Sequence, residues 1–227
     1  MGTDNLFHIR KAQRTAASLK RSKDKHRPYD RVLIVCEGEK TEPSYIQDVR
    51  DDLRLSSANI VVCGKECGSD PVSVVNYALE KFRKDSDYNR IYCVMDRDCH
   101  VNFSAAIDKI QRARLGKNCK IFAATSTPCF EFWLLLHYKY TSRQYIATAK
   151  KSVCDLVIED LKKLTPLKSY EKGHKKIYSI TKDKITTAIM NAKRLQIHHK
   201  AAGTDSPDTL VHELLSYLME IKTNKAV

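Results

Sequence analysis

The sequence predicts an α/β fold, with a mostly parallel β-sheet flanked by helices and a helical C-terminal elaboration. Two short runs of β-branched and aliphatic residues, within 31–42 and 91–98, each end abruptly in acidic residues. Such runs are typical of strands that are buried on both faces of a parallel sheet. Around them, apolar residues recur at helical spacing, so strand and helix alternate along the first half of the chain.

The elements of this first half can be placed from their local signals. A proline at position 43 suits the first turn of a helix, and Ser69 or Asp70 can cap the start of the next one. We expect strands at 31–36, 59–63, 91–98 and 120–125. We expect helices at 43–55, 72–82, 103–115 and 130–138.

The domain organisation follows from changes in composition. Residues 1–29 are polar and basic with few large apolar side chains, which predicts a flexible N-terminal arm. Residues 30–140 form the α/β core, and 141–227 form a helical part packed on it. Ser206, Pro207 and Asp208 resemble a helix start. Apolar periodicity in the C-terminal part predicts helices at 153–164, 185–195 and 210–218.

Acidic side chains follow both buried runs. Glu37, Glu39 and Glu42 come after the first run, and Asp96 and Asp98 end the second. The carboxyl ends of parallel strands meet at one edge of a sheet, so these carboxylates are expected to converge. Like charges at short range oppose ionisation, and oxygen-only ligands favour Mg²⁺ or Mn²⁺. Acids at strand ends are also common because loops are solvated, which is the alternative interpretation.

The second acidic run supplies a paired ligand. Strand alternation puts the side chains of Asp96 and Asp98 on the same face, with Arg97 pointing away. Two carboxylates on one face can hold one divalent ion. Lys40, close to the first group of acids, could offset charge developing on a phosphate or neutralise the acids in the ground state.

The segment 130–138 is dense in apolar residues and predicts a core helix. Glu131 is the exception within it. An acid at the opening of so apolar a segment needs a partner, such as a metal ion or a basic side chain. His137 is interpreted as a core histidine with a satisfied hydrogen bond.

Composition bounds the class of partner. Lys and Arg total 40 against 27 Asp and Glu, which gives a formal net charge of +13. Such a balance favours a polyanionic partner, although basic proteins without nucleic-acid ligands exist. Neither a transmembrane run nor an apolar N-terminal signal is present, so we expect no membrane association and a cytoplasmic protein. The eight cysteines are expected to be reduced, without a zinc site.

A lysine- and tyrosine-rich segment lies between two predicted C-terminal helices. Backbone phosphates could be held by Lys172, Lys175 and Lys176, and a base could stack on Tyr170 or Tyr178. A solvated loop is the alternative interpretation of this segment.

The motifs carry a family resemblance. An acidic turn after a first hydrophobic strand, followed by a strand ending in DxD, resembles the Toprim fold of topoisomerases, primases and OLD-type nucleases. More closely, the chain resembles the RloB family of Toprim-like proteins, found in bacteria and archaea and often near restriction and phage-defence genes. The resemblance covers about 30–222 and is carried by IVCEGEKTEPSY at 34–45, VMDRD at 94–98, STPCFEFWLLLHY at 126–138 and SPDTLVHEL at 206–214.

The resemblance implies roles for individual residues. Glu37 corresponds to the Toprim glutamate that acts as general acid or base, and Asp96 and Asp98 to the DxD pair that binds Mg²⁺. OLD-type nucleases carry a second acid in an EGxTE pattern, whereas here the TE pair that ends in Glu42 sits one residue further on. Glu131 is the best candidate for their later acidic motif, which binds a second metal ion.

The sequence therefore predicts a metal-dependent nuclease that hydrolyses phosphodiester bonds in RNA, tRNA or DNA. A role in prokaryotic anti-phage defence, with a partner protein of the defence system, would follow from the resemblance alone. The main alternative is a nucleic-acid- or partner-binding module of a defence complex without its own catalysis. Such a module would have too few ligands for a catalytic ion. A Toprim enzyme acting on another phosphate substrate is a third interpretation.

Overall fold

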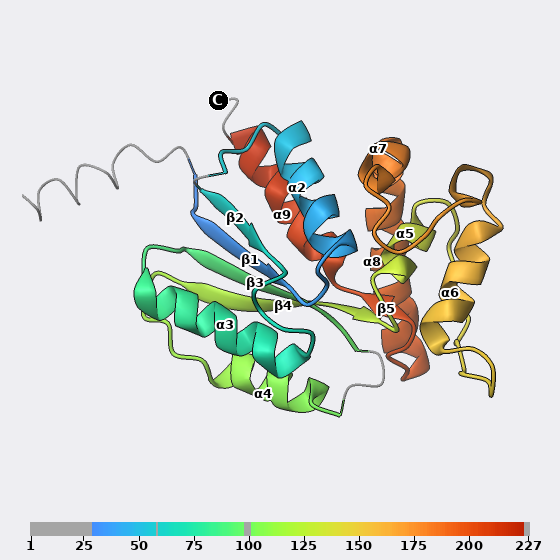
Figure 1. Ribbon diagram of the computed structural model, residues 1–227, viewed down its shortest axis with the longest axis horizontal. Helices are drawn as coiled ribbons and strands as arrows, with labels where there is room; N and C mark the ends of the chain where they lie inside the picture. Colours follow the sequence, from blue (N-terminus) through green and yellow to red (C-terminus); the bar gives the residue numbers. More distant parts are fainter. Residues whose placement is uncertain (1–28, 58, 98–100, 225–227) are drawn as a thin grey trace, which may run out of the picture. The chain divides into compact units, whose positions relative to one another are not determined.

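The sheet is mostly parallel, as the sequence predicts. The computed structural model describes residues 29–57, 59–97 and 101–224. Within these ranges, five strands form one sheet in the order β2-β1-β3-β4-β5 (Figure 1). The strands are β1 (Val32–Cys36), β2 (Ile60–Cys63), β3 (Arg90–Asp96), β4 (Lys120–Thr127) and β5 (Asp208–Thr209). The first four run parallel, and β5 pairs with β4 in the antiparallel direction.

Strand β1 lies at the centre of the core. Each of its five residues is buried, which explains why the run contains no charged side chain. It pairs with β2 on one side and β3 on the other, and Cys36 stands opposite Val94. In this register the residues that follow β1 emerge beside the last residues of β3, so their acids share one edge of the sheet.

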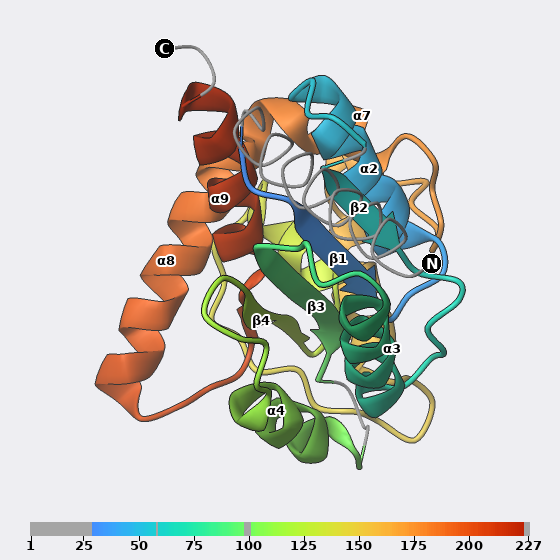
Figure 2. The same ribbon diagram turned by 90° about the vertical axis from the view of Figure 1, so that its left-hand side faces the viewer.

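Helices cover both faces of the sheet. The helices α3 (Pro71–Lys84) and α4 (Phe103–Arg112) pack on one face, and α2 (Thr41–Asp52) and α9 (Val211–Asn224) on the other (Figures 1 and 2). Asp70 caps α3 by accepting hydrogen bonds from the backbone N–H groups of Val72 and Ser73. This is one of the two capping residues that the sequence indicates.

The C-terminal part is helical, which confirms the predicted elaboration. Within it, α5 (Glu131–Leu136) packs against α6 (Val153–Lys162) and α8 (Ile185–Ala202), and also contacts β4 and β5. The elements are α5 (Glu131–Leu136), α6 (Val153–Lys162), the 3₁₀ helix η1 (Thr165–Leu167), α7 (Ile177–Thr181), the 3₁₀ helix η2 (Lys182–Lys184) and α8 (Ile185–Ala202). Contacts with the sheet strands place α5 where it closes the end of β4.

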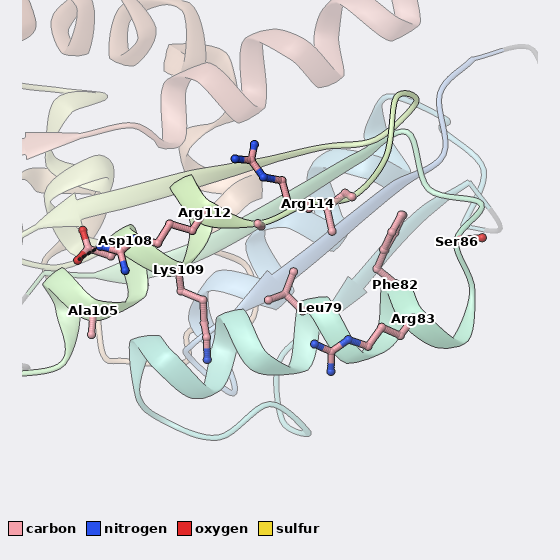
Figure 3. A pocket seen from close by; sticks show the side chains of 11 residues that line it. Leu79, Phe82, Arg83, Ser86, Ala105, Asp108, Lys109, Arg112 and Arg114 are labelled. Atoms are coloured by element: carbon pink, nitrogen blue, oxygen red, sulfur yellow. Dashed lines mark ion pairs between the residues drawn. The ribbon is translucent and has the colours of Figure 1, made fainter.

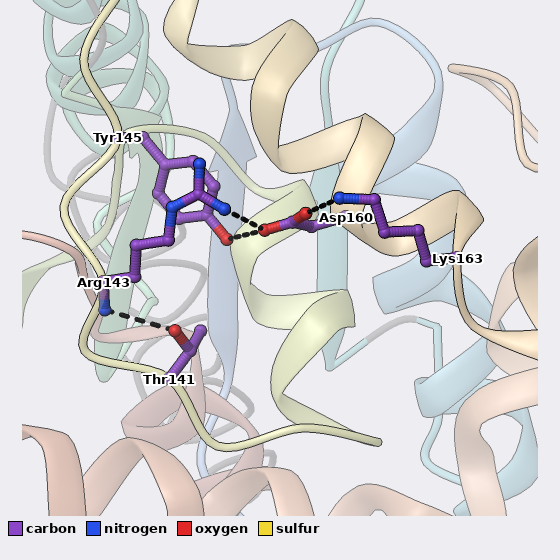
Figure 4. A network of polar contacts seen from close by, with 5 residues as sticks. All are labelled: Thr141, Arg143, Tyr145, Asp160 and Lys163. Atoms are coloured by element: carbon purple, nitrogen blue, oxygen red, sulfur yellow. Dashed lines mark hydrogen bonds and ion pairs between the residues drawn. The ribbon is translucent and has the colours of Figure 1, made fainter.

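A polar network ties α6 to the extended segment before it (Figure 4). The buried carboxylate of Asp160 accepts hydrogen bonds from Tyr145 Oη at 3.0 Å and from Arg143 at 3.2 Å. Lys163 donates to its other oxygen at 2.6 Å. Burial alone would raise the pKa of Asp160, but the hydrogen bonds from Lys163 and Tyr145 outweigh it and lower the pKa. The network fixes the position of α6 against that segment.

A groove of about 750 Å³ opens between α3 and α4 (Figure 3). Leu79, Phe82 and Leu115 supply apolar lining, and Arg83 and Arg114 supply cationic lining. Figure 3 shows Leu79 and Phe82 projecting from α3, with Arg114 on the other side of the groove. The acids at the carboxyl edge of the sheet do not line it, so the groove is separate from the candidate site.

The domain boundaries can be compared with the structure only in part. The predicted arm, residues 1–29, lies outside the described residues except for Tyr29. From Arg31 onward the chain forms one unit that contains both the sheet and the C-terminal helices. Across the described ranges, every helix is too short or too polar to cross a membrane.

Candidate active site at the carboxyl edge of the sheet

Four acidic residues from four elements meet at the carboxyl edge of the sheet. Glu37 follows β1, Glu42 lies in the first turn of α2, Asp96 ends β3 and Glu131 begins α5. Burial, followed by the negative charges of Glu42, Glu131 and Glu37, raises the pKa of Asp96 well above its ordinary value. We call these four residues the acid cluster. Each was a candidate metal ligand on sequence grounds, and the structure brings them together.

Glu37 and Asp96 are held in place by the backbone of neighbouring strands. The N–H of Asp96 donates a 3.1 Å hydrogen bond to Oε2 of Glu37. The N–H of Glu37 donates to the carbonyl of Val94 at 2.9 Å, and that of Arg97 donates to the carbonyl of Ser126 at 2.7 Å. The parallel ladder therefore continues past the strand ends and fixes both half-buried acids. The Arg97 side chain forms an ion pair with Asp205.

Glu42 folds back over the turn that precedes its helix. A Cβ atom at Gly38 would lie 1.9 Å from Oε2 of Glu42, so only glycine leaves room for this carboxylate. Burial raises the pKa of Glu42 to about 7; the charges of Glu131 and Glu37 add to the rise, and Lys172 and a backbone hydrogen bond oppose it. The second residue of the EG turn thus has a steric role in the acid cluster.

Glu131 is the most deeply buried member of the acid cluster, with 3% of its surface exposed. The sequence indicated that this acid needs a partner, and the structure supplies Tyr170, whose Oη donates a 2.9 Å hydrogen bond to Oε1. Tyr170 was a candidate for stacking on a base. With 1% of its surface exposed, its ring packs in the protein interior and cannot stack on a nucleic acid.

The ring of the second stacking candidate is also covered by the protein. Tyr178 is buried with 6% of its surface exposed, and its Oη donates a 3.0 Å hydrogen bond to Oδ2 of Asp52 in α2. The physical reason is that the segment folds onto α2 and α5, where both rings are covered. The tyrosines therefore belong to the core and not to a substrate surface.

The lysines predicted to hold phosphates occupy different places. Lys172, Lys175 and Lys176 are all exposed. Burial alone would lower the pKa of Lys172, but the charges of Glu131 and Asp96 outweigh it and raise the pKa. Of these three lysines, Lys172 lies between the two residues that bond to Glu131 and Thr41. Lys40 is also exposed, and its aliphatic chain lies against Gly173.

The donor set suits a hard divalent cation. Carboxylate oxygens are ligands that Mg²⁺ and Mn²⁺ prefer, and a cluster of like charges is stabilised by cations. Within the described ranges, however, no three Asp, Glu, His or Cys side chains are arranged so that they could hold a metal ion as they stand. Asp98, the second acid of the DxD pair, lies outside the described residues.

Two thiols border the acid cluster, which the sequence gave no reason to expect. A hydrogen bond with Cys154, then burial and the charges of Glu131 and Asp96, raise the pKa of Cys129 well above its ordinary value. The Cys129 thiol is therefore neutral at physiological pH. The seven cysteines in the described part of the chain form no disulfide.

Comparison with known families decides the relationship. A family model described as RloB-like protein matches residues 32–218, which includes all four members of the acid cluster. The chain belongs to the RloB-like family. Searches of curated proteins and of solved structures found no match. The RloB-like match extends from β1 into α9, so the family covers the sheet and the C-terminal helices together.

Proposed function

We propose that this protein is a metal-dependent nuclease that hydrolyses phosphodiester bonds in RNA, tRNA or DNA. The observation that carries the proposal is the acid cluster, in which carboxylates from β1, α2, β3 and α5 converge at the edge where α/β sheets place their chemistry. Carboxylates whose pKa values are raised by burial and by neighbouring like charges are typical of functional sites. The Toprim-like resemblance of the EG and DxD motifs supports the same chemistry.

Charge supports a nucleic acid as the substrate. The chain carries a formal net charge of +13, although its proposed centre is acidic. A polyanion would be attracted by the exposed lysines around the site, while its reacting phosphate would need a cation among the carboxylates. Lys175 and Lys176 are exposed and available for backbone phosphates.

We assign the cofactor as Mg²⁺ or Mn²⁺, held by Asp96, Asp98 and Glu37, with Glu131 and Glu42 for a second ion. A bound ion would supply Lewis-acid chemistry and a more acidic water. Glu37 holds or relays a proton, because its carboxylate is fixed by the Asp96 N–H and oriented at the sheet edge. Lys40 offsets charge that develops on the phosphate.

The biological setting is proposed on the family resemblance. We place the protein in the cytoplasm of a prokaryote, in anti-phage defence, with a partner protein of the defence system. An isolated protein that cleaves nothing would then either need its partner protein or have no catalysis of its own. The tests below therefore measure the binding of nucleic acid and of Mn²⁺ as well as cleavage.

The test is cleavage of labelled tRNA, single-stranded RNA and duplex DNA in Mg²⁺, Mn²⁺ or EDTA. Wild type is compared with Asp96→Asn and with the control Asp108→Asn, which removes an exposed acid on α4. We expect metal-dependent cleavage by wild type and by the control, and none by Asp96→Asn. Cleavage that persists in EDTA or in Asp96→Asn would refute the assignment.

One observation favours a second function. Because no three candidate ligands in the described ranges are arranged to hold an ion, a binding module without catalysis also fits the geometry. It would bind nucleic acid or a partner protein through its basic surface. Salt-sensitive binding of nucleic acid by wild type and by Asp96→Asn alike, with neither cleavage nor Mn²⁺ binding, would select this function.

A further inference from the structure

A strap of residues 168–176 is anchored at two points beside the acid cluster. At the first, Tyr170 Oη donates to Oε1 of Glu131 at 2.9 Å. At the second, the N–H of Gly173 donates to Oγ1 of Thr41, the first residue of α2, at 2.8 Å. The strap therefore bridges the starts of α5 and α2, the two helices that contribute Glu131 and Glu42.

The second anchor needs a glycine. Gly173 has a φ of +84°, a conformation that side-chain-bearing residues rarely adopt. A Cβ atom there would also lie 3.2 Å from Cδ of Lys40, so the strap packs directly on the turn after β1. Buried Thr41 and buried Tyr170 make both anchors internal to the protein. The two anchors thus fix the position of the strap relative to Glu131 and the start of α2.

Lys172 lies between the two anchors. Tyr170 and Gly173 on either side of it are bonded to Glu131 and Thr41, so the backbone at Lys172 is held between the starts of α5 and α2. The charges of Glu131 and Asp96 act on this lysine, and its own charge opposes the rise in the pKa of Glu42. Among the described residues, Lys172 forms no ion pair, and its side chain is exposed.

This combination distinguishes Lys172 from the other lysines of the strap. A lysine in an ion pair already binds a carboxylate. An ammonium group without an ion pair, next to the acid cluster, can bind an incoming phosphate. Lys175 and Lys176 follow the second anchor and precede α7, beyond the residues that are tied to the acids. Lys168, an exposed lysine before the first anchor, provides a matched control on the same segment.

We propose that Lys172 is a further catalytic residue of this site, whose ammonium binds a non-bridging oxygen of the phosphoryl group under attack, and that Tyr170 is the positioning residue that holds Glu131. The inference rests on the proposed hydrolytic function. Hydrolysis adds water across one P–O bond, so the attacking oxygen joins phosphorus and the leaving oxygen takes a proton. Lys172 stays protonated and stabilises the charge that develops on the phosphoryl oxygens.

The kinetic test separates a catalytic lysine from a lysine that only attracts the substrate. We expect Lys172→Gln to lower the cleavage rate at saturating substrate by at least about 100-fold with little change in nucleic-acid Kd. Lys168→Gln, at an exposed lysine of the same strap, is the control and should leave both the saturated rate and the Kd unchanged. Lys172→Arg, which keeps the charge, should recover part of the rate. A saturated rate for Lys172→Gln equal to wild type would overturn the inference.

A second readout needs no cleavage. Removing the positive charge of Lys172 beside the acid cluster should tighten Mn²⁺ binding by about fivefold in Lys172→Gln, whereas Lys168→Gln should leave the Mn²⁺ affinity unchanged. Tyr170→Phe should loosen Glu131 and weaken Mn²⁺ binding while the protein stays folded. Unchanged Mn²⁺ affinity in Lys172→Gln would contradict its place beside the acids. If wild type cleaves and Lys172→Gln has the same saturated rate, only this inference fails; if wild type neither cleaves nor binds Mn²⁺, the proposed function fails with it.

Discussion

The backbone N–H of Asp96 donates a hydrogen bond to Oε2 of Glu37, across two parallel strands, at 3.1 Å. The bond joins residues 59 positions apart in the sequence. It uses a backbone donor, so it survives changes to the Asp96 side chain. The bond orients the half-buried Glu37 carboxylate from the neighbouring strand, so its position depends on the register of β1 and β3.

This geometry gives a prediction for Glu37→Gln. The amide oxygen can still accept the Asp96 N–H bond, so the melting temperature should stay within about 2 °C of wild type. The charge needed for metal binding and proton transfer is lost, so the rate of cleavage should fall at least about 100-fold. Circular dichroism melting and gel-based cleavage assays measure the two effects. Wild-type cleavage by Glu37→Gln would remove Glu37 from the site.

Gly38→Ala tests the steric role of the EG turn. The new methyl group would occupy the space of the Glu42 carboxylate, and this flexible side chain can move away at low cost. We expect a folded protein whose Mn²⁺ affinity falls by about tenfold, because Glu42 leaves the acid cluster. Glu39→Ala, at an exposed neighbouring position, is the control and should bind Mn²⁺ as wild type does. Equal affinities in both variants would show that Glu42 does not hold an ion.

His137 predicts a pH dependence of stability. Its Nδ1 lies 3.0 Å from the carbonyl of Trp133, and its Nε2 lies 3.2 Å from Tyr45 Oη. Burial lowers the pKa of His137 from 6.5 to about 4, whereas hydrogen bonds to the carbonyls of the preceding turn oppose the shift. The unfolded state therefore binds the proton more tightly, so stability is full above pH 6.5 and is lost as pH falls toward 4.

The measurement is the free energy of unfolding at several pH values in urea. We expect the His137 contribution to decrease by roughly 2 to 3 kcal/mol between about pH 7.5 and pH 4.5. His137→Phe should lose this part of the pH dependence, while His198→Gln, at an exposed position on α8, should keep it. The same pH slope in wild type and His137→Phe would show that another group is responsible.

Asp160→Asn tests the network that fixes α6. The substitution removes the charge that Arg143 and Lys163 pair with and weakens the bond from buried Tyr145. The free energy of unfolding should fall by about 1 to 3 kcal/mol. Glu159→Gln, next to it on α6 and half-exposed, is the control and should change stability little. A loss in the control as large as in Asp160→Asn would show that the network adds no stability of its own.

Much of the sheet was predictable from local pattern. The uncharged runs that end at Cys36 and Asp96 indicated buried strands, and the structure has β1 and β3 there. Alternation with amphipathic helices indicated parallel strands, because parallel neighbours need a crossover connection and this is usually a helix. Strand β5 was not predictable. It has two residues, Asp208 and Thr209, and its pairing with β4 is set by tertiary packing, in a stretch where the sequence indicated a helix start.

The site, too, could be predicted from the sequence only in part. Acids at strand ends follow a local rule, so Glu37 and Asp96 could be identified from the sequence. The partner of Glu131 could not, because Tyr170 lies 39 residues away on a segment whose composition is typical of a solvated loop. Neither the tyrosine-to-acid bond nor the second anchor at Thr41 leaves a periodic signal. Only the folded chain shows that two tyrosines are buried and that Lys172 lies beside the acids.

The most direct test of the central claim is a count of Mn²⁺ ions bound by the acid cluster, measured by electron paramagnetic resonance of free Mn²⁺ during titration. Wild type and the control Asp108→Asn should each bind at least one ion per chain, and Asp96→Asn should lose that binding. If wild type binds no Mn²⁺, or if Asp96→Asn binds it equally well, the acid cluster is not a metal centre.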